Sequence, residues 1–380
     1  MKKVTIQEVA KEAGVSPTTV SNFFNDRLNH MRVGTKQRIE KAIATLGYVP
    51  NQAAQQLRTG KTPMIGLLVP TVANSFFGEL AVEMEQAAKE QGFRIILCNT
   101  LQSASNERDF WFGLHALGVR GVICSSALVT VEELEEYVKM GLCVVAVDEK
   151  PCEHLPPSVD FVSIDHKQSI RLAVDHLVEL GHSSISYIAD FSNTTFSRRS
   201  KAEGFLDAVA SHGLRDCHLV MPNHSEGTPR FSDKELAELG RTAVSIILSE
   251  HPDTTAIVTF NDMTALGAIE ALKERQIAVP ERISVVGIDG ISVGELLSPT
   301  ITSVRQPLQM SAVKAIASVA EQLDRGRRQR KDIIIAPELI VRKSSAPPPR
   351  CNIDTLSPHP GTNDRPSPDE NIVTARINQK

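Results

Sequence analysis

The stretch from Val4 to Asn25 constrains the fold of this chain more than any other. Its first half has apolar residues at the spacing of one helix face, and Gly14 can adopt the positive φ that commonly ends a helix. The Ser16 hydroxyl can cap a second helix. Pro17 suits the first position of that helix, because it has no amide hydrogen that would need a partner there. The apolar residues of the first helix are Ile6, Val9, Ala10 and Ala13.

The second predicted helix is apolar on one side and polar but uncharged on the other. Val20 and either Phe23 or Phe24 are expected to pack inward. Two short helices joined by a tight glycine corner are typical of a helix-turn-helix, whose second helix lies in the major groove of DNA. A helical hairpin at a domain edge would have the same spacing. The outer face is expected to carry Thr18, Thr19, Ser21, Asn22 and Asn25.

The charge distribution favours DNA binding over a simple hairpin. Residues 1–62 contain ten Lys or Arg and four Asp or Glu, in a chain whose net charge is −4, so the rest of the chain is acidic. A basic amino-terminal module on an acidic body is typical of a protein that binds phosphates.

The residues from Val4 to Ser21 also resemble the opening of the lactose/galactose repressor (LacI/GalR) family almost letter for letter. The family pattern is V-T-hydrophobic-x-x-V-A-x-x-A-G-V-S-x-x-T-V-S-R. This chain has Asn22 where the family has Arg, and because Asn pairs with adenine whereas Arg pairs with guanine, we expect an unusual half-site. The resemblance implies headpiece contacts with DNA from Thr5, Ser16, Pro17, Thr18, Thr19, Ser21, Asn22 and Asn25.

A third helix should complete a DNA-binding headpiece over residues 1–48. This helix is expected to start near Thr35 and to end at Gly47, after a loop from Asp26 to Gly34. Three short helices are enough to close a small core of this kind.

Residues 49–62 form the next segment, which has helix-forming residues between Pro50 and Pro63. A helix this short is marginal in water, so the segment could be a partly helical linker. The resemblance implies instead a hinge helix that orders on DNA. In that helix Ala53 and Ala54 would pack across a dimer axis and Leu57 would wedge between base steps in the minor groove. The implied hinge contacts with DNA come from Asn51, Ala54 and Leu57.

From Met64 onward, apolar strand-like segments alternate with helical segments, which indicates parallel sheets covered on both faces. A second set begins near Phe161, so the pattern predicts two doubly wound α/β subdomains with a ligand cleft at the carboxyl ends of the strands. The expected strands are 64–70, 93–98, 121–124, 143–147, 185–189, 218–221, 256–259 and 283–288. The expected helices are 76–91, 106–117, 168–180, 202–212, 234–249 and 265–275.

This body resembles the type I periplasmic-binding-protein fold that the LacI/GalR family uses as its effector domain. Family landmarks include the E-L-G-H run at residues 179–182, and the resemblance assigns residues 63–343 to effector binding and dimerisation. It implies a small polar ligand, commonly a sugar. Lys201 stands where the family has Arg, and because it is a point donor rather than a planar fork, the identity of the ligand is left open. The implied effector-binding residues are Asn74, Phe76, Phe77, Asp148, Ser197, Lys201, Asn261 and Asp289.

Several features have plainer interpretations. Asn261 could simply cap the helix that follows it. The G-x-S-x-G motif at residues 290–294 matches a nucleophile elbow, but the single later histidine, His359, lies in a Pro-rich tail that is expected to be disordered over residues 344–380. The loose group His212, Cys217, His218 and His224 fits no zinc spacing and is interpreted as surface loop residues.

The sequence therefore predicts a ligand-responsive transcription regulator and favours a repressor over an activator. It is expected to be a cytoplasmic homodimer that binds pseudo-palindromic double-stranded DNA, without enzymatic activity, cofactor, metal or membrane. The six cysteines form no regular framework, and the start of the chain lacks the apolar core of a signal peptide. The alternative is a solute-binding protein of a transport system on the same cleft fold, which would need a signal peptide and no headpiece.

Overall fold

The computed structural model describes the headpiece and most of the two-subdomain body. The described residues are 4–24, 31–48, 63–125, 128, 130–148, 156–190, 195–222, 232–326 and 329–349. Asn25 and the hinge residues Asn51, Ala54 and Leu57 lie outside them, so their predicted contacts with DNA stay predictions.

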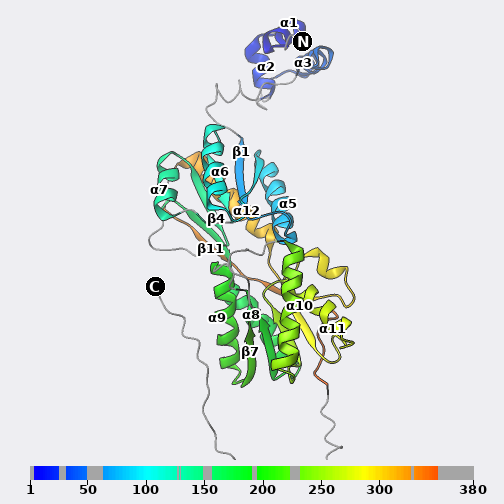
Figure 1. The fold of residues 1–380 in the computed structure, drawn as a ribbon. Helices are drawn as coiled ribbons and strands as arrows, with labels where there is room; N and C mark the ends of the chain where they lie inside the picture. Colours follow the sequence, from blue (N-terminus) through cyan, green and yellow to red (C-terminus); the bar gives the residue numbers. More distant parts are fainter. Residues whose placement is uncertain are drawn as a thin grey trace, which may run out of the picture.

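The first three helices form a small domain with its own core (Figure 1). The predicted corner is confirmed, since Gly14 has a φ of 62° and the Ser16 hydroxyl caps the second helix. Val9, Val20 and Ile39 are fully buried, so each helix contributes a side chain to this core. The helices are α1 (Ile6–Ala13), α2 (Pro17–Phe24) and α3 (Val33–Leu46).

The structure corrects the position of Ser21, which the sequence places on the outer face of the second helix. Ser21 is only 7% exposed. The helix contacts both α1 and α3, so the buried sector of this short helix is wider than a single face. The third helix also begins at Val33, slightly before the predicted start at Thr35.

The first subdomain is a six-stranded parallel sheet with helices on both faces. Its strand order is β11-β5-β4-β3-β1-β2. Alternate side chains of each strand face opposite ways, so Leu67 packs with α5 and α12 whereas Leu68 packs with α6 and α7. The strands are β1 (Met64–Val69), β2 (Arg94–Asn99), β3 (Gly121–Cys124), β4 (Cys143–Val147), β5 (Asp160–Ile164) and β11 (Asp332–Ile335). The helices are α5 (Ser75–Glu90), α6 (Ala104–Ala116), α7 (Val131–Lys139) and α12 (Leu308–Arg325).

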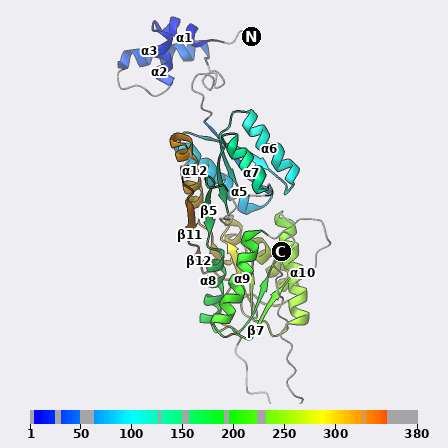
Figure 2. The ribbon, with the colours of Figure 1, turned by 90° about the vertical axis from the view of Figure 1, so that its left-hand side faces the viewer.

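The second subdomain repeats this plan with the strand order β12-β10-β9-β8-β6-β7. All pairs are parallel except β10 with β12. Helix α8 packs with α9 beside this sheet (Figure 2), and α10 packs with α11 (Figure 1). The strands are β6 (Ser184–Ile188), β7 (Asp216–Val220), β8 (Ala256–Thr259), β9 (Ser284–Asp289), β10 (Thr302–Arg305) and β12 (Glu338–Ile340). The helices are α8 (His166–Glu179), α9 (Phe196–Ser211), α10 (Asp233–Glu250), α11 (Asp262–Glu274) and the short 3-10 helix η1 (Ser292–Glu295).

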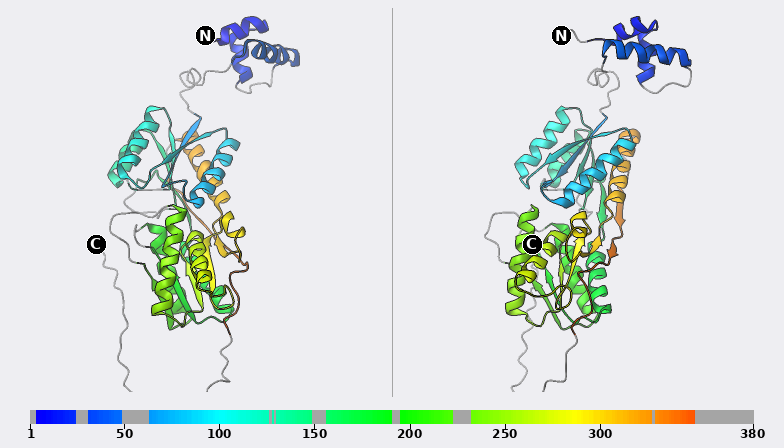
Figure 3. Two further views of the ribbon diagram at one scale, coloured as in Figure 1. Left: turned by 45° about the vertical axis from the view of Figure 1, so that its right-hand side comes forward. Right: turned by 90° about the vertical axis from the view of Figure 1, so that its right-hand side faces the viewer.

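The chain crosses between the two subdomains three times. The crossings lie between β5 and α8, between β10 and α12, and between β11 and β12. Figure 3 shows the result, with α12 beside α5 although the two helices are far apart in the sequence. The second subdomain therefore does not begin near Phe161, as the sequence suggests, because that strand pairs with β4 and β11 in the first sheet.

The packed body continues past residue 343, where the sequence predicts a disordered tail to begin. Ser344 is fully buried, and its hydroxyl donates to the Val285 carbonyl at 2.5 Å. The Ala346 amide donates to the Ser284 hydroxyl at 3.0 Å. These contacts run beside the first residues of β9, before its pairing with β10 begins at Val286, so the predicted boundary is too early. The described chain continues to residue 349.

Candidate functional site

The candidate DNA-contacting side chains gather at the amino-terminal end of α2. Ser16, Pro17 and Thr18 are exposed, whereas Thr19 and Asn22 are partly buried. The Ser16 and Thr19 hydroxyls lie 2.9 Å apart. Their arrangement leaves hydroxyl groups at the amino-terminal end of α2, with the Asn22 carboxamide further along the helix. Such groups are suited to hydrogen bonds with phosphates and base edges.

Thr5 lies at the start of α1, where it forms a complete capping box. The Thr5 amide donates to the Glu8 carboxylate at 2.7 Å, and the Thr5 hydroxyl accepts from the Glu8 amide at 3.4 Å. Thr5 is exposed, but its amide and hydroxyl both donate to the Glu8 carboxylate, so its predicted contact with DNA stays a prediction.

In the body, the candidate effector residues form two groups, one from each subdomain. In the second subdomain, Asp289 ends β9 and is 7% exposed, and Lys201 projects from α9 and is 5% exposed. The Lys201 ammonium lies 3.8 Å from an Asp289 carboxylate oxygen and donates to the Phe260 carbonyl at 3.0 Å. Gln306 donates from its amide to the same Asp289 oxygen at 2.7 Å.

A second buried carboxylate, Asp262, lies behind Asp289. It accepts from the Ser303 hydroxyl at 2.5 Å and from the Ile291 amide at 2.9 Å. Burial raises the pKa of both carboxyls above their usual range. The negative charge of Asp289 raises the pKa of Asp262 further, whereas Lys201 acts to lower that of Asp289. Burial therefore favours the neutral form of both carboxyls, which can donate as well as accept hydrogen bonds.

The first subdomain contributes Asp148, which follows β4 and has a φ of 64°. Its carboxylate accepts a 2.5 Å hydrogen bond from His166 Nε2, at the first residue of α8. This contact joins the two subdomains at one of the crossings. The other ring nitrogen of His166 is buried, and no described residue is its hydrogen-bond partner.

Phe76 reaches across from the first subdomain into the core of the second. It is 8% exposed and belongs to the buried cluster formed by the strands and helices of the second subdomain. Phe77 contacts it edge-on, with ring centroids 5.2 Å apart, and packs against both subdomain cores. Both rings lie between the subdomains, and their predicted contact with a ligand stays a prediction.

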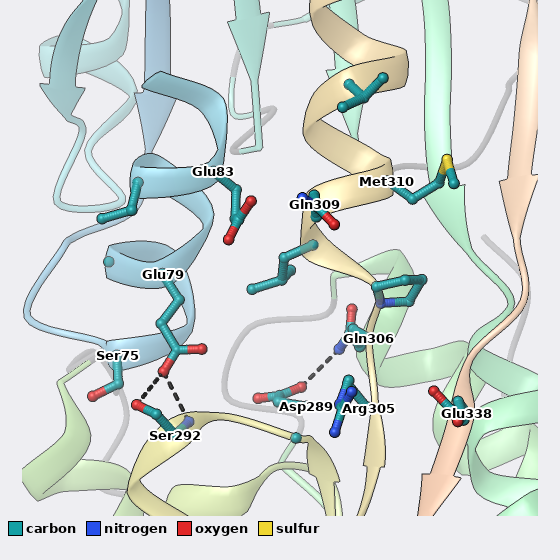
Figure 4. A pocket seen from close by; sticks show the side chains of 16 residues that line it. Ser75, Glu79, Glu83, Asp289, Ser292, Arg305, Gln306, Gln309, Met310 and Glu338 are labelled. Carbon is teal, nitrogen blue, oxygen red and sulfur yellow. Dashed lines mark hydrogen bonds between the residues drawn. The ribbon is translucent and has the colours of Figure 1, made fainter. Parts of the chain in front are cut away.

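A groove of about 950 Å³ runs between α5, α12 and the loops of the second subdomain (Figure 4). Asp289 and Gln306 lie at its base, and Glu79 reaches over it to Ser292. Gln306 also borders a smaller cavity that Phe76 and Asp148 line. Gln306 and Leu308 line both spaces, and Gln306 is the polar residue of the two.

The side chains of three candidate residues hydrogen-bond to neighbours in the sequence. Asn74 caps α5 by accepting from the Phe76 amide at 3.0 Å, and Asn261 caps α11 by accepting from the Thr264 amide at 2.9 Å. The capping alternative for Asn261 is therefore confirmed for its carbonyl oxygen. Ser197 lies in the first turn of α9, where its hydroxyl is 3.2 Å from that of Thr195.

The sequence missed three residues that the structure places at the junction of the subdomains. His166 and Gln306 stand at chain crossings, and Glu79 lies one helical turn after Ser75 on α5. Of these three, only Gln306 could have been found from the sequence, because it is a polar residue directly before Pro307 at the end of a strand. The contacts of His166 and Glu79 depend on how the two sheets face each other.

The other motifs have structural roles. The Ser292 hydroxyl of the G-x-S-x-G motif donates to Glu79 at 2.7 Å, while His359 and His224 lie outside the described residues. Cys217 and His218 lie in the edge strand β7 rather than in a surface loop, because that strand starts earlier than predicted. Within the described ranges, no group of three His, Cys, Asp or Glu is placed to hold a metal ion, and no helix could cross a membrane.

Comparisons with known proteins agree with this arrangement. The lacI family of bacterial regulatory proteins matches residues 5–51, and a periplasmic binding protein-like domain matches residues 174–345. The HTH-type transcriptional regulator DegA of Bacillus subtilis (strain 168) is 32% identical over 351 residues, covering 91% of this chain and 99% of DegA.

Two solved structures share the fold. The lac repressor dimer bound to operator and an anti-inducer is 24% identical and has a TM-score of 0.73, covering 91% of this chain and all of that one. A periplasmic binding protein/LacI transcriptional regulator from Alkaliphilus metalliredigens QYMF, complexed with D-xylulofuranose, is 26% identical with a TM-score of 0.65. The match covers 75% of this chain and 99% of the chain in that structure. The chain described here is a DNA-binding transcriptional regulator of the LacI family.

Proposed function

We propose that this regulator is a repressor whose affinity for its operator is switched by a small polar ligand, a sugar or sugar derivative. The ligand binds between the two subdomains. The observation that carries the proposal is the buried pair of Asp289 and Lys201 beside Gln306, a charged cluster that faces the first subdomain. A carboxylate and an ammonium at one buried site offer an acceptor and donors to vicinal hydroxyl groups.

Both subdomains contribute to this site, which is what a switch requires. Asp148 and the two phenylalanines belong to the first, whereas Lys201, Asn261 and Asp289 belong to the second. A ligand that touches both groups favours the closed arrangement by its differential affinity for it. The hinge segment leaves the first subdomain at Pro63, so a change in that subdomain's orientation alters the spacing of the two hinges on DNA. The bound sugar of the Alkaliphilus relative supports the choice of ligand class.

The experiment is a thermal-shift screen of sugars and nucleobases on the full chain, followed by operator binding with and without each hit. A ligand of the cleft stabilises the folded protein by mass action, so it raises the unfolding temperature. A hit that also changes operator affinity supports the proposal. If sugars that raise the unfolding temperature leave operator affinity unchanged, the switching function is wrong.

We also propose that the active form is a homodimer on a pseudo-palindromic site, that it acts in the cytoplasm and that it has no enzymatic activity. Val82 is 64% exposed and lines the groove on α5, beside Met310 and Val313 on α12, which are also exposed. Exposed apolar side chains that gather on one face are typical of a protein interface. Val82→Asp should lower the dimer fraction in sedimentation experiments, whereas Val341→Asp, at an exposed apolar residue outside this groove, should not.

A further inference from the structure

Helix α5 makes two polar contacts with the second subdomain from a single face. Ser75 and Glu79 are one helical turn apart, so their side chains project from the same side of the helix. Ser75 contacts Asp233 at the start of α10, and Glu79 contacts Ser292 at the start of η1. Both partners lie far along the chain and belong to the other subdomain.

In the first contact, a carboxylate from the second subdomain caps a helix of the first. Asp233 accepts from the Ser75 amide at 3.0 Å and also from the Ser75 hydroxyl. Its own amide donates to the Ala73 carbonyl at 3.2 Å. Helix α10 does not use the Asp233 carboxylate as its cap, since Ser232 and Glu235 form a complete capping box there. The Asp233 side chain is therefore available to the neighbouring subdomain.

In the second contact, a carboxylate from the first subdomain caps a helix of the second. The Glu79 carboxylate accepts from the Ser292 amide at 2.9 Å and from the Ser292 hydroxyl at 2.7 Å. The residue at the cap position of η1 is Ile291, which has no side-chain acceptor, and η1 receives no cap from it. A first-subdomain carboxylate thus supplies the cap that the second-subdomain helix lacks.

These two reciprocal contacts can form only when the subdomains face each other as they do here. The chain crossings tie the subdomains together at their hinges but do not fix the angle between them. Hydrogen bonds to a carboxylate are stronger than those between neutral groups, so four such bonds on one helix face favour one angle. Phe76, which lies between Ser75 and Glu79 in sequence, adds apolar burial at the same place.

We propose that Ser75, Glu79, Asp233 and Ser292 form a clasp that stabilises the angle between the two subdomains seen in this structure. The clasp sets the fraction of the protein in which the subdomains face each other at this angle. Its regulatory consequence rests on the function proposed above: the clasp would set how much effector is needed to change operator affinity. The clasp itself requires neither DNA nor effector and can be tested without them.

The test compares the ligand-free full chain with Glu79→Ala, Asp233→Ala and the double variant. Matched controls are Glu85→Ala, an exposed acid on the same helix, and Asp253→Ala, an exposed acid on the second subdomain. Small-angle X-ray scattering measures the radius of gyration, and hydrogen exchange measures protection of the Ser292 and Ser75 amides. We expect a larger radius in the double variant and amide exchange at least about tenfold faster, the factor for one charge-assisted hydrogen bond.

The controls should keep the radius and the exchange rates of the parent chain. Ser75→Ala and Glu79→Gln, which weaken the clasp without deleting a whole contact, give the same comparison if the double variant does not fold. An unchanged radius and unchanged exchange outside residues 73–79 and 290–296, where the lost hydrogen bonds act directly, would overturn the proposal in a folded clasp variant, because the angle would then be fixed by packing alone. That result would leave ligand switching untouched, since switching is tested by operator affinity.

Discussion

The Lys201 ammonium and the Asp289 carboxylate lie 3.8 Å apart, both almost completely buried, where the second subdomain faces the first. Burial of this pair is unfavourable unless its hydrogen bonds are satisfied. Lys201 also donates to the Phe260 carbonyl, and Asp289 also accepts from Gln306. The pair is thus held in place by the protein before any ligand arrives, which reduces the ordering cost of binding.

Asp289→Ala should abolish the response to the ligand while leaving operator binding without ligand intact. The substitution removes a buried acceptor and leaves Lys201 without its counter-charge, so we expect ligand binding to weaken by about 1–3 kcal/mol or more. The measurement is operator affinity with and without ligand for both proteins, with Glu85→Ala as the charge control. A variant that still switches at the same ligand concentration would place the effector site elsewhere.

The unfolding free energy should fall as pH rises toward about 8, because of Asp262. Burial and the charge of Asp289 raise the pKa of Asp262 from 3.8 to about 8 in the folded state. Between pH 3.8 and about pH 8, the Asp262 carboxyl holds a proton in the folded state that it has released in the unfolded state. The stabilisation is therefore fully present below pH 3.8 and is lost by about pH 8. Asp262→Asn cannot ionise, so its unfolding temperature should decline less between about pH 5 and pH 8 than that of the parent. An equal decline in both proteins would contradict this assignment.

Local sequence patterns predicted the elements well where one segment determines its own structure. Gly14 ends α1 because the positive φ is encoded at that residue, and β9 ends at Asp289 because a buried apolar run stops there. Parallel pairing then places strand ends at a common edge, so Asp289 could be assigned to the interface between the subdomains from the sequence.

Contacts between distant segments could not be predicted in the same way. Glu79 and Ser292 are 213 residues apart, and no local signal marks either as half of a pair. The strand β5 carries the same apolar pattern as its neighbours, so the sequence could not tell which sheet it joins. Ser21 is polar, and its burial depends on how α1 and α3 pack against α2 and not on its own chemistry.

Operator affinity should depend steeply on salt. The basic surplus in residues 1–62 indicates that phosphate contacts contribute much of the binding energy, with counterions released on binding. The logarithm of the affinity should fall with the logarithm of salt concentration by about 0.9 per phosphate neutralised. Affinities measured between low and physiological salt give this slope. A slope near zero would exclude a phosphate-dominated interface.

Leu57→Ala should weaken operator binding by about 1–3 kcal/mol with little effect on non-specific DNA. Leu57 lies outside the described residues, and the prediction follows from the resemblance of its segment to a hinge helix that wedges open a base step. Titrations on operator and random duplexes provide the measurement, and the unfolding temperature of the body is the control. Equal losses on both duplexes would identify Leu57 as an ordinary linker residue.

Asn22 should determine the preferred base at one position of each half-site. It lies on α2 beside the buried Ser21, is itself partly exposed, and stands where the family has Arg. A carboxamide donates to and accepts from adenine, whereas a guanidinium donates to both acceptors of guanine. Asn22→Arg should therefore shift the preference at that position toward guanine, while Asn22→Ala should make it nearly indifferent. Each good bidentate pair contributes about 1–3 kcal/mol of discrimination, so a binding-site selection would detect the change. Thr45→Ala, on α3, is the control, because its hydroxyl donates to the Lys41 carbonyl within its own helix. If both Asn22 variants select the parent site, as the control does, Asn22 does not read a base.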